Sequence, residues 1–105
     1  MLKESHIEWN IIRYLRSIGW IVIKHRSTGR FANGRMITLP KDELGVSDII
    51  AVSPDGIAHF LEIKTPKGRQ SEYQKMFENM VKAKGSRYTI LRSLEDAENY
   101  AQNLS

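Results

Sequence analysis

Asp48, Glu62 and Lys64 are the residues of this 105-residue chain whose types and spacing could do chemistry together. Asp48 and Glu62 each interrupt a short apolar stretch, and the turn-forming sequence Pro54-Asp55-Gly56 lies between the two stretches. The spacing predicts a hairpin in which Asp48 faces Glu62 and Lys64 follows on the same face. A regular hairpin would hold the Cβ atoms of the two acidic residues roughly 4.5–5.5 Å apart, whereas a bulge would break the pairing.

Two carboxylates at this separation repel each other, so the pair requires a compensating positive charge. A divalent cation is one solution, because Mg²⁺ is typically held by one or two carboxylates together with water and substrate phosphate. The alternative is that Lys64 neutralises Asp48 and Glu62 in an ion cluster. Both interpretations are open at this point, and the geometry favours the metal.

The segment Thr65–Gln70, which follows Lys64, is basic and turn-forming because it contains Pro66, Lys67, Gly68 and Arg69. It therefore places more positive charge beside the two carboxylates, which would suit a phosphate backbone. The alternative is an ordinary connection between a strand and a helix, and the two interpretations are compatible.

Glu4 is unusual because it lies close to an apolar helical stripe formed by Ile7, Ile11, Leu15 and Ile18. At about 100° per residue, Glu4 lies roughly 25° from the centre of this stripe and Glu8 roughly 65°. Glu4 either points along the core face toward the carboxylate pair or lies in the first helical turn, where an acidic residue favours the helix dipole.

Gln74 also has two interpretations. The sequence Ser71-Glu72-Tyr73-Gln74 fits a capping box, in which Ser71 caps the helix and Gln74 reaches back to it. Gln74 also lies at the edge of the apolar side of the same predicted helix, from where it could reach the carboxylate pair. The residues alone favour the cap.

The histidines do not have the spacing of metal ligands. His59 is expected to face away from Asp48 and Glu62, because side chains alternate along a strand. His6, His25 and His59 are all predicted to be surface or packed residues, with a phosphate contact left open for His25. The chain has no cysteine, P-loop, GxGxxG sequence or evident hydrolytic triad.

The elements that must position these residues follow from hydrophobic periodicity and turn signals. The order is α-β-β-β-α-β-α, and a long polar loop at residues 25–44 follows the first strand. We expect an α/β fold with a sheet of about four strands covered by helices on both sides. The predicted helices are 3–18, 71–84 and 94–103, and the predicted strands are 20–24, 47–52, 57–64 and 88–92.

Length and charge limit the class of protein. A chain of this length predicts one domain, residues 1–105, and a net charge of +4 with no acidic residue between Glu8 and Asp42 favours a polyanionic partner over a merely solvated surface. No segment resembles a signal peptide or is long enough to span a bilayer, so we expect a soluble cytoplasmic protein without membrane association.

The ordered motifs resemble a known family. Gly45-Val46-Ser47-Asp48-Ile49-Ile50 followed by Phe60-Leu61-Glu62-Ile63-Lys64 resembles the PD-(D/E)xK nuclease signature, with Ser47 where a proline is usual. Within that superfamily the chain is similar to a stand-alone VRR-NUC domain of the viral or bacterial kind. The resemblance covers nearly the whole chain and implies a restriction-endonuclease-like mixed sheet.

The resemblance also implies site residues and a cofactor. It implies that Asp48, Glu62 and the main-chain carbonyl of Ile63 bind Mg²⁺ or Mn²⁺, with no organic cofactor. It assigns the first-helix glutamate to Glu4 and makes Glu8 the weaker candidate. It implies that Lys64 orients or deprotonates the attacking water, and that Gln74 is the family's helix glutamine. Relatives of this size resemble Holliday-junction resolvases in fold and often form homodimers.

These observations predict a metal-dependent DNA endonuclease that is selective for DNA structure, such as branched or Holliday-junction-like DNA, rather than for sequence. Basic side chains would hold the DNA backbone. The alternatives are a DNA-binding module without catalysis and a structural or partner-interaction domain in which the carboxylates and Lys64 form an ion cluster. The candidate DNA-binding residues are Arg26, Arg30, Arg35, Lys67 and Arg69.

Overall fold

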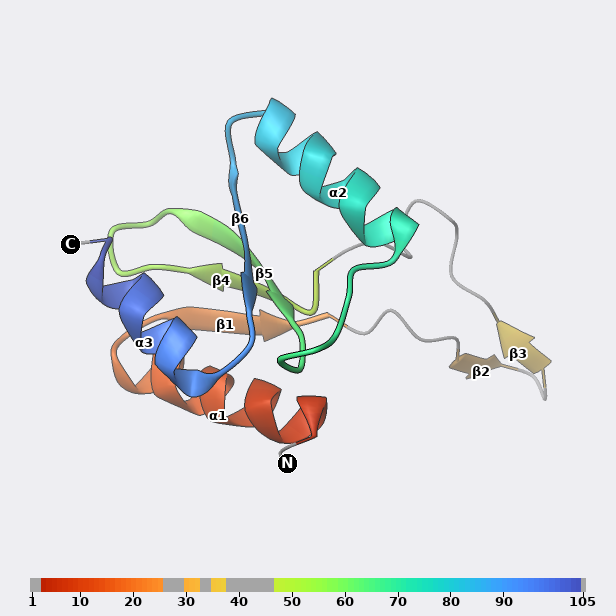
Figure 1. The fold of residues 1–105 in the computed structure, drawn as a ribbon, viewed down its shortest axis with the longest axis horizontal. Coiled ribbons are helices and arrows are strands. Elements are labelled where there is room, and N and C mark those ends of the chain that lie inside the picture. Colours follow the sequence, from red (N-terminus) through yellow and green to blue (C-terminus); the bar gives the residue numbers. More distant parts are fainter. Residues whose placement is uncertain (1–2, 26–29, 33–34, 38–46, 105) are drawn as a thin grey trace.

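A computed structural model describes residues 3–25, 30–32, 35–37 and 47–104 of the chain (Figure 1). The long elements predicted from the sequence are all present, and their bounds differ from the predicted ones by no more than two residues. In chain order they are α1 (Glu4–Ser17), β1 (Ile21–Lys24), β2 (Arg30–Ala32), β3 (Arg35–Ile37), β4 (Ile49–Val52), β5 (Ala58–Ile63), α2 (Glu72–Ala83), β6 (Arg87–Leu91) and α3 (Leu94–Gln102).

The main sheet has four strands in the order β1-β4-β5-β6. The β1–β4 and β4–β5 pairs are antiparallel, and the β5–β6 pair is parallel, so the sheet is mixed. Helix α2 supplies the crossover that a parallel pair requires, because β5 and β6 run in the same direction. The expected α/β class with about four strands is therefore confirmed.

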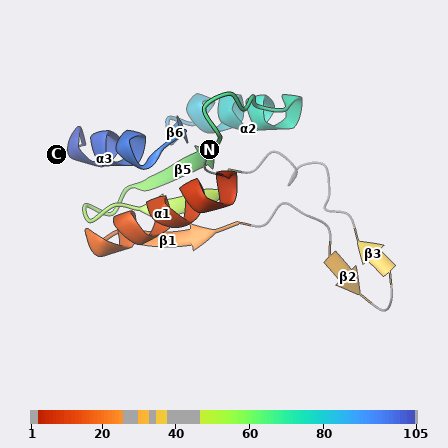
Figure 2. The ribbon, with the colours of Figure 1, turned by 60° about the horizontal axis from the view of Figure 1, so that its bottom comes forward.

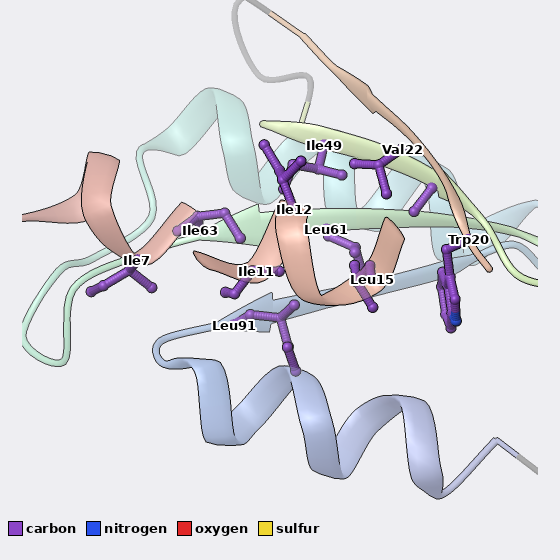
Figure 3. Packing of buried hydrophobic residues seen from close by; sticks show 12 residues of the cluster. Ile7, Ile11, Ile12, Leu15, Trp20, Val22, Ile49, Leu61, Ile63 and Leu91 are labelled. Carbon is purple, nitrogen blue, oxygen red and sulfur yellow. The ribbon is translucent and has the colours of Figure 1, made fainter. Parts of the chain in front are cut away.

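Helices α1 and α3 cover one face of this sheet. The apolar side of α1 packs on the inward residues of β4 and β5, and Leu91 of β6 lies between α1 and α3 (Figure 3). The side chains of Ile11, Ile49, Leu61 and Ile63 are completely buried there. Ile7, Ile11 and Leu15 of the predicted stripe therefore belong to the core, whereas Ile18, the last residue of that stripe, is 40% exposed.

Helix α2 lies on the opposite face, where its Phe77 meets Phe60 of β5 and Tyr88 of β6 edge to face, with ring centroids 5.5 and 6.2 Å apart. Helices therefore lie on both faces, as expected. The cover on the α2 side is partial, because Ile21 and Ile23 of β1 remain 63% and 54% exposed on that face.

The hairpin formed by β4 and β5 is regular. Ile50 pairs with Phe60 and Val52 with Ala58, which is the register that the turn predicts. The Gly56 N–H donates to the Ser53 carbonyl at 2.8 Å, and Gly56 has a φ of 87°, a conformation that glycine adopts at little cost. The register that aligns Asp48 with Glu62 therefore begins at a well-formed turn.

His59 lies on the α1–α3 face, as strand alternation predicts. It is 1% exposed, and its Nδ1 lies 2.7 Å from the Tyr100 hydroxyl of α3. Its Nε2 lies 3.1 Å from the Ser53 hydroxyl. Burial is the main cause that lowers the pKa of His59, and the positive charge of Arg87 lowers it further. His59 is therefore a packed histidine that joins α3 to the hairpin turn.

The prediction of a structureless loop at residues 25–44 is wrong in part, because β2 and β3 pair there as a separate two-stranded antiparallel sheet. The reason is visible in the sequence, where Asn33-Gly34 separates Phe31 from Met36 and Asn-Gly is a strong hairpin signal. The polar and basic residues around this signal are more typical of a loop. The remaining residues of this stretch lie outside the described ranges, apart from His25.

None of the helices in the described part of the chain is long and apolar enough to cross a membrane.

Candidate active site

Asp48 lies one residue before β4 and continues its register, so it is level with Glu62 of β5. Its main-chain carbonyl accepts a hydrogen bond from the His25 N–H at 2.8 Å, and its side-chain Oδ2 accepts one from the Ile63 N–H at 2.8 Å. Just before it, the buried Ser47 donates from Oγ to the Ile49 carbonyl at 3.1 Å. The Asp48 carboxylate is thus held against the end of β5 by Ile63, and the Asp48 backbone is held by His25.

The carbonyl of Ile63 points toward the same end of the hairpin. The N–H and C=O groups of one residue in a strand point to the same side, and the Ile63 N–H is directed at Asp48. The carbonyl oxygen of Ile63 therefore points to the side of β5 on which Asp48 lies. This orientation fits the role that the family resemblance implies for it.

The Glu62 side chain is 1% exposed and has only part of its hydrogen-bonding capacity satisfied. Its Oε2 accepts a hydrogen bond from the Gln74 amide at 2.8 Å and lies 3.7 Å from Lys64 Nζ. Its Oε1 is buried and has no hydrogen-bond partner among the described residues. A buried carboxylate oxygen without a partner is costly unless the group is protonated or binds a cation.

The electrostatics of Glu62 agree with this geometry. Burial raises the pKa of Glu62 to about 9, and the hydrogen bond that its acid form makes to Asp48 and the negative charge of Asp48 act in the same direction. The positive charge of Lys64 lowers this pKa, but it does not cancel the other effects. Without a cation, Glu62 therefore holds a proton at neutral pH.

Gln74 fulfils both of its predicted roles at once. Its backbone N–H donates to Ser71 Oγ at 3.2 Å, and its side-chain Oε1 accepts from the Ser71 N–H at 2.8 Å, which completes the capping box of α2. Because the cap uses the amide oxygen, the amide nitrogen must face the other way, and it donates to Glu62. The cap therefore sets which end of the amide meets the carboxylate.

This double role can be tested with Ser71→Ala and Gln74→Ala. Each variant removes one half of the capping box, so each should lower the free energy of unfolding by about 1 kcal/mol in urea denaturation. Only Gln74→Ala also removes the donor to Glu62, so it should weaken metal binding, measured by calorimetry, more than Ser71→Ala does. If the two variants bound metal with equal affinity, the hydrogen bond from Gln74 to Glu62 would have no role in metal binding.

Glu4 lies at the same end of the sheet. The beginning of α1, the end of β5 and the beginning of α2 all lie toward that end in two views (Figures 1 and 2). Burial raises the pKa of Glu4, the negative charge of Asp48 raises it further, and Lys64 lowers it. Glu4 is therefore within electrostatic reach of Asp48 and Lys64, as expected if it points toward the pair.

Glu8 lies one turn further along α1 and has a different partner. It is 8% exposed, and its Oε1 forms an ion pair of 3.2 Å with Nζ of Lys24, the last residue of β1. This ion pair directs the Glu8 carboxylate to Lys24 rather than to Asp48 and Glu62, which agrees with Glu8 being the weaker candidate.

His25 is a residue that sequence reasoning placed in the basic loop and that the structure brings to the site. The β1–β4 register ends at Lys24 and Ile49, so His25 follows level with Asp48, to which its N–H donates. Its Nε2 is buried without a hydrogen-bond partner in the described part of the chain. The alternation Ile21-Ile23-His25 could have placed it on this face, once the β1–β4 register was known.

The candidate DNA-binding residues are only partly placed. Lys67 and Arg69 are exposed on the connection that leaves β5 beside the site. Arg26 lies outside the described residues. Arg30 and Arg35 have their backbones in β2 and β3, while their side chains are outside the described part.

The donor set fits a hard cation such as Mg²⁺ or Mn²⁺. Two opposed carboxylates, one with an unpartnered buried oxygen, are oxygen ligands of the kind that these ions prefer. Within the described residues, no group of three His, Cys, Asp or Glu side chains is arranged to hold a metal ion. A site for Mg²⁺ does not need one, because that ion usually keeps several waters and is completed by substrate phosphate.

Comparison with known proteins identifies the fold. The chain is similar to a solved structure described as a VRR_NUC domain, with a TM-score of 0.75 and 16% sequence identity over 100% of both chains. No family model matches the sequence, and no curated protein matches it either. The chain therefore has the VRR-NUC fold, with its mixed sheet flanked by helices, as the motifs led us to expect.

Proposed function

From a chain with the VRR-NUC fold, we propose a Mg²⁺- or Mn²⁺-dependent DNA endonuclease whose active site is formed by Asp48, Glu62 and Lys64. The observation that carries this proposal is the buried, unpartnered Oε1 of Glu62 beside a second carboxylate. Lys64 approaches only Oε2, the oxygen that Gln74 already contacts, so in an ion cluster with Lys64 the Oε1 oxygen would depend on a proton shared with Asp48. A cation held by Glu62 and Asp48 would take the place of that proton.

We assign the metal to the carboxylates of Asp48 and Glu62 and the main-chain carbonyl of Ile63. Glu4 of α1 does not form a three-carboxylate group with them among the described residues, and we assign it a supporting role, as a nearby negative charge. When bound, such an ion polarises a phosphate oxygen and lowers the pKa of a coordinated water. The hydrogen bond from Ile63 keeps the Asp48 carboxylate oriented, and the Gln74 amide does the same for Glu62. Such supporting contacts commonly tune a metal site.

Lys64 is the residue that we assign to the attacking water. Its side chain is 13% exposed, and its Nζ lies 3.7 Å from Oε2 of Glu62, which supports a role beside the proposed metal ligands. Lys64 orients that water or accepts its proton, and the water oxygen bonds to phosphorus as the bond from phosphorus to the leaving sugar oxygen breaks. Gln74 assists by holding Glu62 in place.

The DNA backbone would be held by Lys67 and Arg69 together with Arg26, Arg30 and Arg35. Lysine and arginine contacts to phosphate position a duplex but carry no sequence information, so selectivity would come from DNA shape. We therefore propose a preference for branched or Holliday-junction-like DNA over a particular base sequence.

We also propose that the protein acts as a homodimer, as is common among the relatives it resembles. On the α2 side of the sheet, Ile21, Ile23, Met76 and Met80 are large apolar side chains that are more than half exposed. Exposed apolar surface of this kind commonly marks an interface. A symmetric dimer would carry two active sites, which suits cleavage of two strands at a junction.

The homodimer can be tested by sedimentation. The wild-type protein should have about twice the 12.1 kDa mass of one chain. Ile23→Lys should return it to the mass of one chain, because a charge would replace an apolar contact. Trp9→Lys changes an equally exposed residue on α1, 54% as for Ile23, and should leave the dimer intact. A single-chain mass for the wild type would overturn the proposal.

The decisive experiment for the function is incubation of purified protein with a panel of linear, nicked, flap and four-way-junction DNAs in Mg²⁺, in Mn²⁺ and in EDTA. The proposal requires cleavage with either metal and none with EDTA. A DNA-binding module would bind the same DNAs and leave them intact in all three buffers. A structural domain would show neither salt-sensitive DNA affinity nor metal binding by calorimetry.

A further inference from the structure

The connection that follows Lys64 folds into a tight turn over residues Thr65–Gly68. The Gly68 N–H donates to the Thr65 carbonyl at 3.0 Å, and Pro66 occupies the second position, which proline favours in such turns. Lys67 is the third residue of this turn, and its side chain is exposed. The turn therefore carries a cation a few residues from the proposed active site.

Arg92 holds this turn from the neighbouring strand. Its Nη1 donates to the carbonyl oxygens of Thr65 and Gly68 at 2.7 Å each and lies 3.4 Å from that of Pro66. The β5–β6 register explains the contact, because Ile63 pairs with Leu91 and Arg92 is therefore level with Lys64. The side chain of Arg92 reaches over the end of β5 to the segment that leaves it.

The backbone of Arg92 is itself fixed. Its N–H donates to Oδ2 of Asp96 at 2.9 Å, and Asp96 lies in the first turn of α3, which Ser93 caps. Hydrogen bonds from a charged guanidinium are stronger than those between neutral groups. The turn is thus attached through Arg92 to the helix that packs against α1.

Gly68 shows how closely the turn is packed. A Cβ atom added to Gly68 would lie 3.1 Å from Thr65 Oγ1 and 3.4 Å from the backbone nitrogen and carbonyl oxygen of Thr65. A side chain at this position would therefore press on the Thr65 hydroxyl, which would have to move by a few tenths of an ångström, and would be in ordinary contact with the backbone of Thr65. The absence of a side chain at Gly68 thus suits the turn that Arg92 holds by hydrogen bonds.

We propose that Arg92 is a positioning residue for DNA, which fixes the Thr65–Gly68 turn so that Lys67 and Arg69 meet a backbone phosphate of the strand bound at the active site. The three carbonyl oxygens of the turn face Arg92, so their partial negative charges do not face the phosphate. Lys67 and Arg69 remain outside, where both are exposed. This inference rests on the proposed function and names part of the surface that holds its substrate.

A double-mutant cycle tests the proposal, because it measures whether Lys67 depends on Arg92. The affinity of full-length wild type, Lys67→Ala, Arg92→Gln and the double variant for a labelled duplex is measured by fluorescence anisotropy in EDTA, over a range of salt concentrations. In wild-type protein, Lys67→Ala should weaken binding severalfold and reduce the slope of log affinity against log salt by about 0.9, the value for one phosphate contact. In the Arg92→Gln background, Lys67→Ala should change neither quantity appreciably.

Two further variants separate positioning from charge and from stability. Gly68→Ala presses on the Thr65 hydroxyl of the same turn without removing a cation, and it should reduce the effect of Lys67→Ala. Arg87→Gln makes the same change of residue type at an exposed position at the start of β6, and it should preserve that effect. Urea denaturation of each variant checks folding. If Arg92→Gln is unfolded, the same comparison is made with Arg92→Lys and Gly68→Ala in its place.

Additive effects of Lys67→Ala and Arg92→Gln would overturn the inference, because a residue that contacts phosphate by itself, or one that only stabilises the fold, would not alter what Lys67 contributes. Failure of the proposed function has a different signature. In that case the wild-type protein would not bind DNA at all, or would bind it without cleaving it in Mg²⁺.

Discussion

Lys64→Ala is expected to lower the rate of Mg²⁺-dependent DNA cleavage by about 10²–10⁴-fold, the usual contribution of a positioned acid or base. The Lys64 side chain lies beside Glu62 and is nearly enclosed, and alanine leaves nothing there to orient or deprotonate water. The chain should remain folded, because Lys64 follows β5 and does not belong to the core cluster. Single-turnover cleavage of a labelled junction measures the rate, and circular dichroism measures the fold.

The matched control is Lys84→Ala. Lys84 follows α2 at the end away from Gln74, is exposed, and carries the same charge. Its loss should change cleavage no more than the loss of one surface charge does. If Lys64→Ala cleaves DNA at the wild-type rate, the assignment of Lys64 to the attacking water is wrong. If both variants lose activity equally, overall charge rather than position is responsible.

The stability of the metal-free protein is expected to fall as pH rises from about 7 toward 9. Glu62 keeps its proton in the folded chain up to about pH 9, whereas the unfolded chain releases it near the ordinary glutamate value of 4.5. The folded state therefore binds more protons in this range, and its stability decreases with rising pH. The contribution is fully present below pH 4.5 and is lost as pH passes through 9.

The comparison that isolates Glu62 is urea denaturation of wild type and Glu62→Gln from pH 7 to 9 in EDTA. The range begins above the pKa of His59, which is lowered and therefore changes stability only at more acidic pH. Glu62→Gln cannot ionise, so its stability should vary less with pH than that of the wild type. Glu78→Gln is the matched control, because the pKa of Glu78 is lowered and lies outside the range.

A cation should reverse this dependence. Metal binding requires the carboxylate form of Glu62, so the affinity for Mg²⁺ or Mn²⁺ should rise with pH, and saturating metal should restore the stability that is lost toward pH 9. Parallel pH profiles of wild type and Glu62→Gln, with or without metal, would show that Glu62 does not carry the proton that we assign to it.

The central geometry of the site could be predicted because it depends only on local rules. The turn at residues 53–56 and the alternation of side chains are enough to align Asp48 with Glu62 and to place His59 on the other face. Gln74 was identified as a cap from four consecutive residues, and the cap is present. In these cases short-range sequence determines the position of the side chain.

The remaining contacts depend on pairings between segments that are far apart in the chain. His25 reaches the site only through the register of β1 on β4, and Arg92 reaches the Thr65–Gly68 turn only through the parallel register of β6 on β5. No local pattern fixes either register. The strands β2 and β3 differ, because their hairpin signal, Asn33-Gly34, is local but stands among basic and polar residues that are more typical of a loop.

The capping box of α2 links fraying of this helix to the proposed active site, because Gln74 belongs to both. When the first turn of α2 opens, the Ser71 N–H loses its hydrogen bond to the side-chain Oε1 of Gln74, and the amide nitrogen that donates to Glu62 loses its fixed orientation. Amide hydrogen exchange at the Ser71 and Gln74 N–H groups would therefore report the fraction of molecules ready for catalysis. Bound metal should slow that exchange, because an ion held by Glu62 also restrains the side chain that closes the cap.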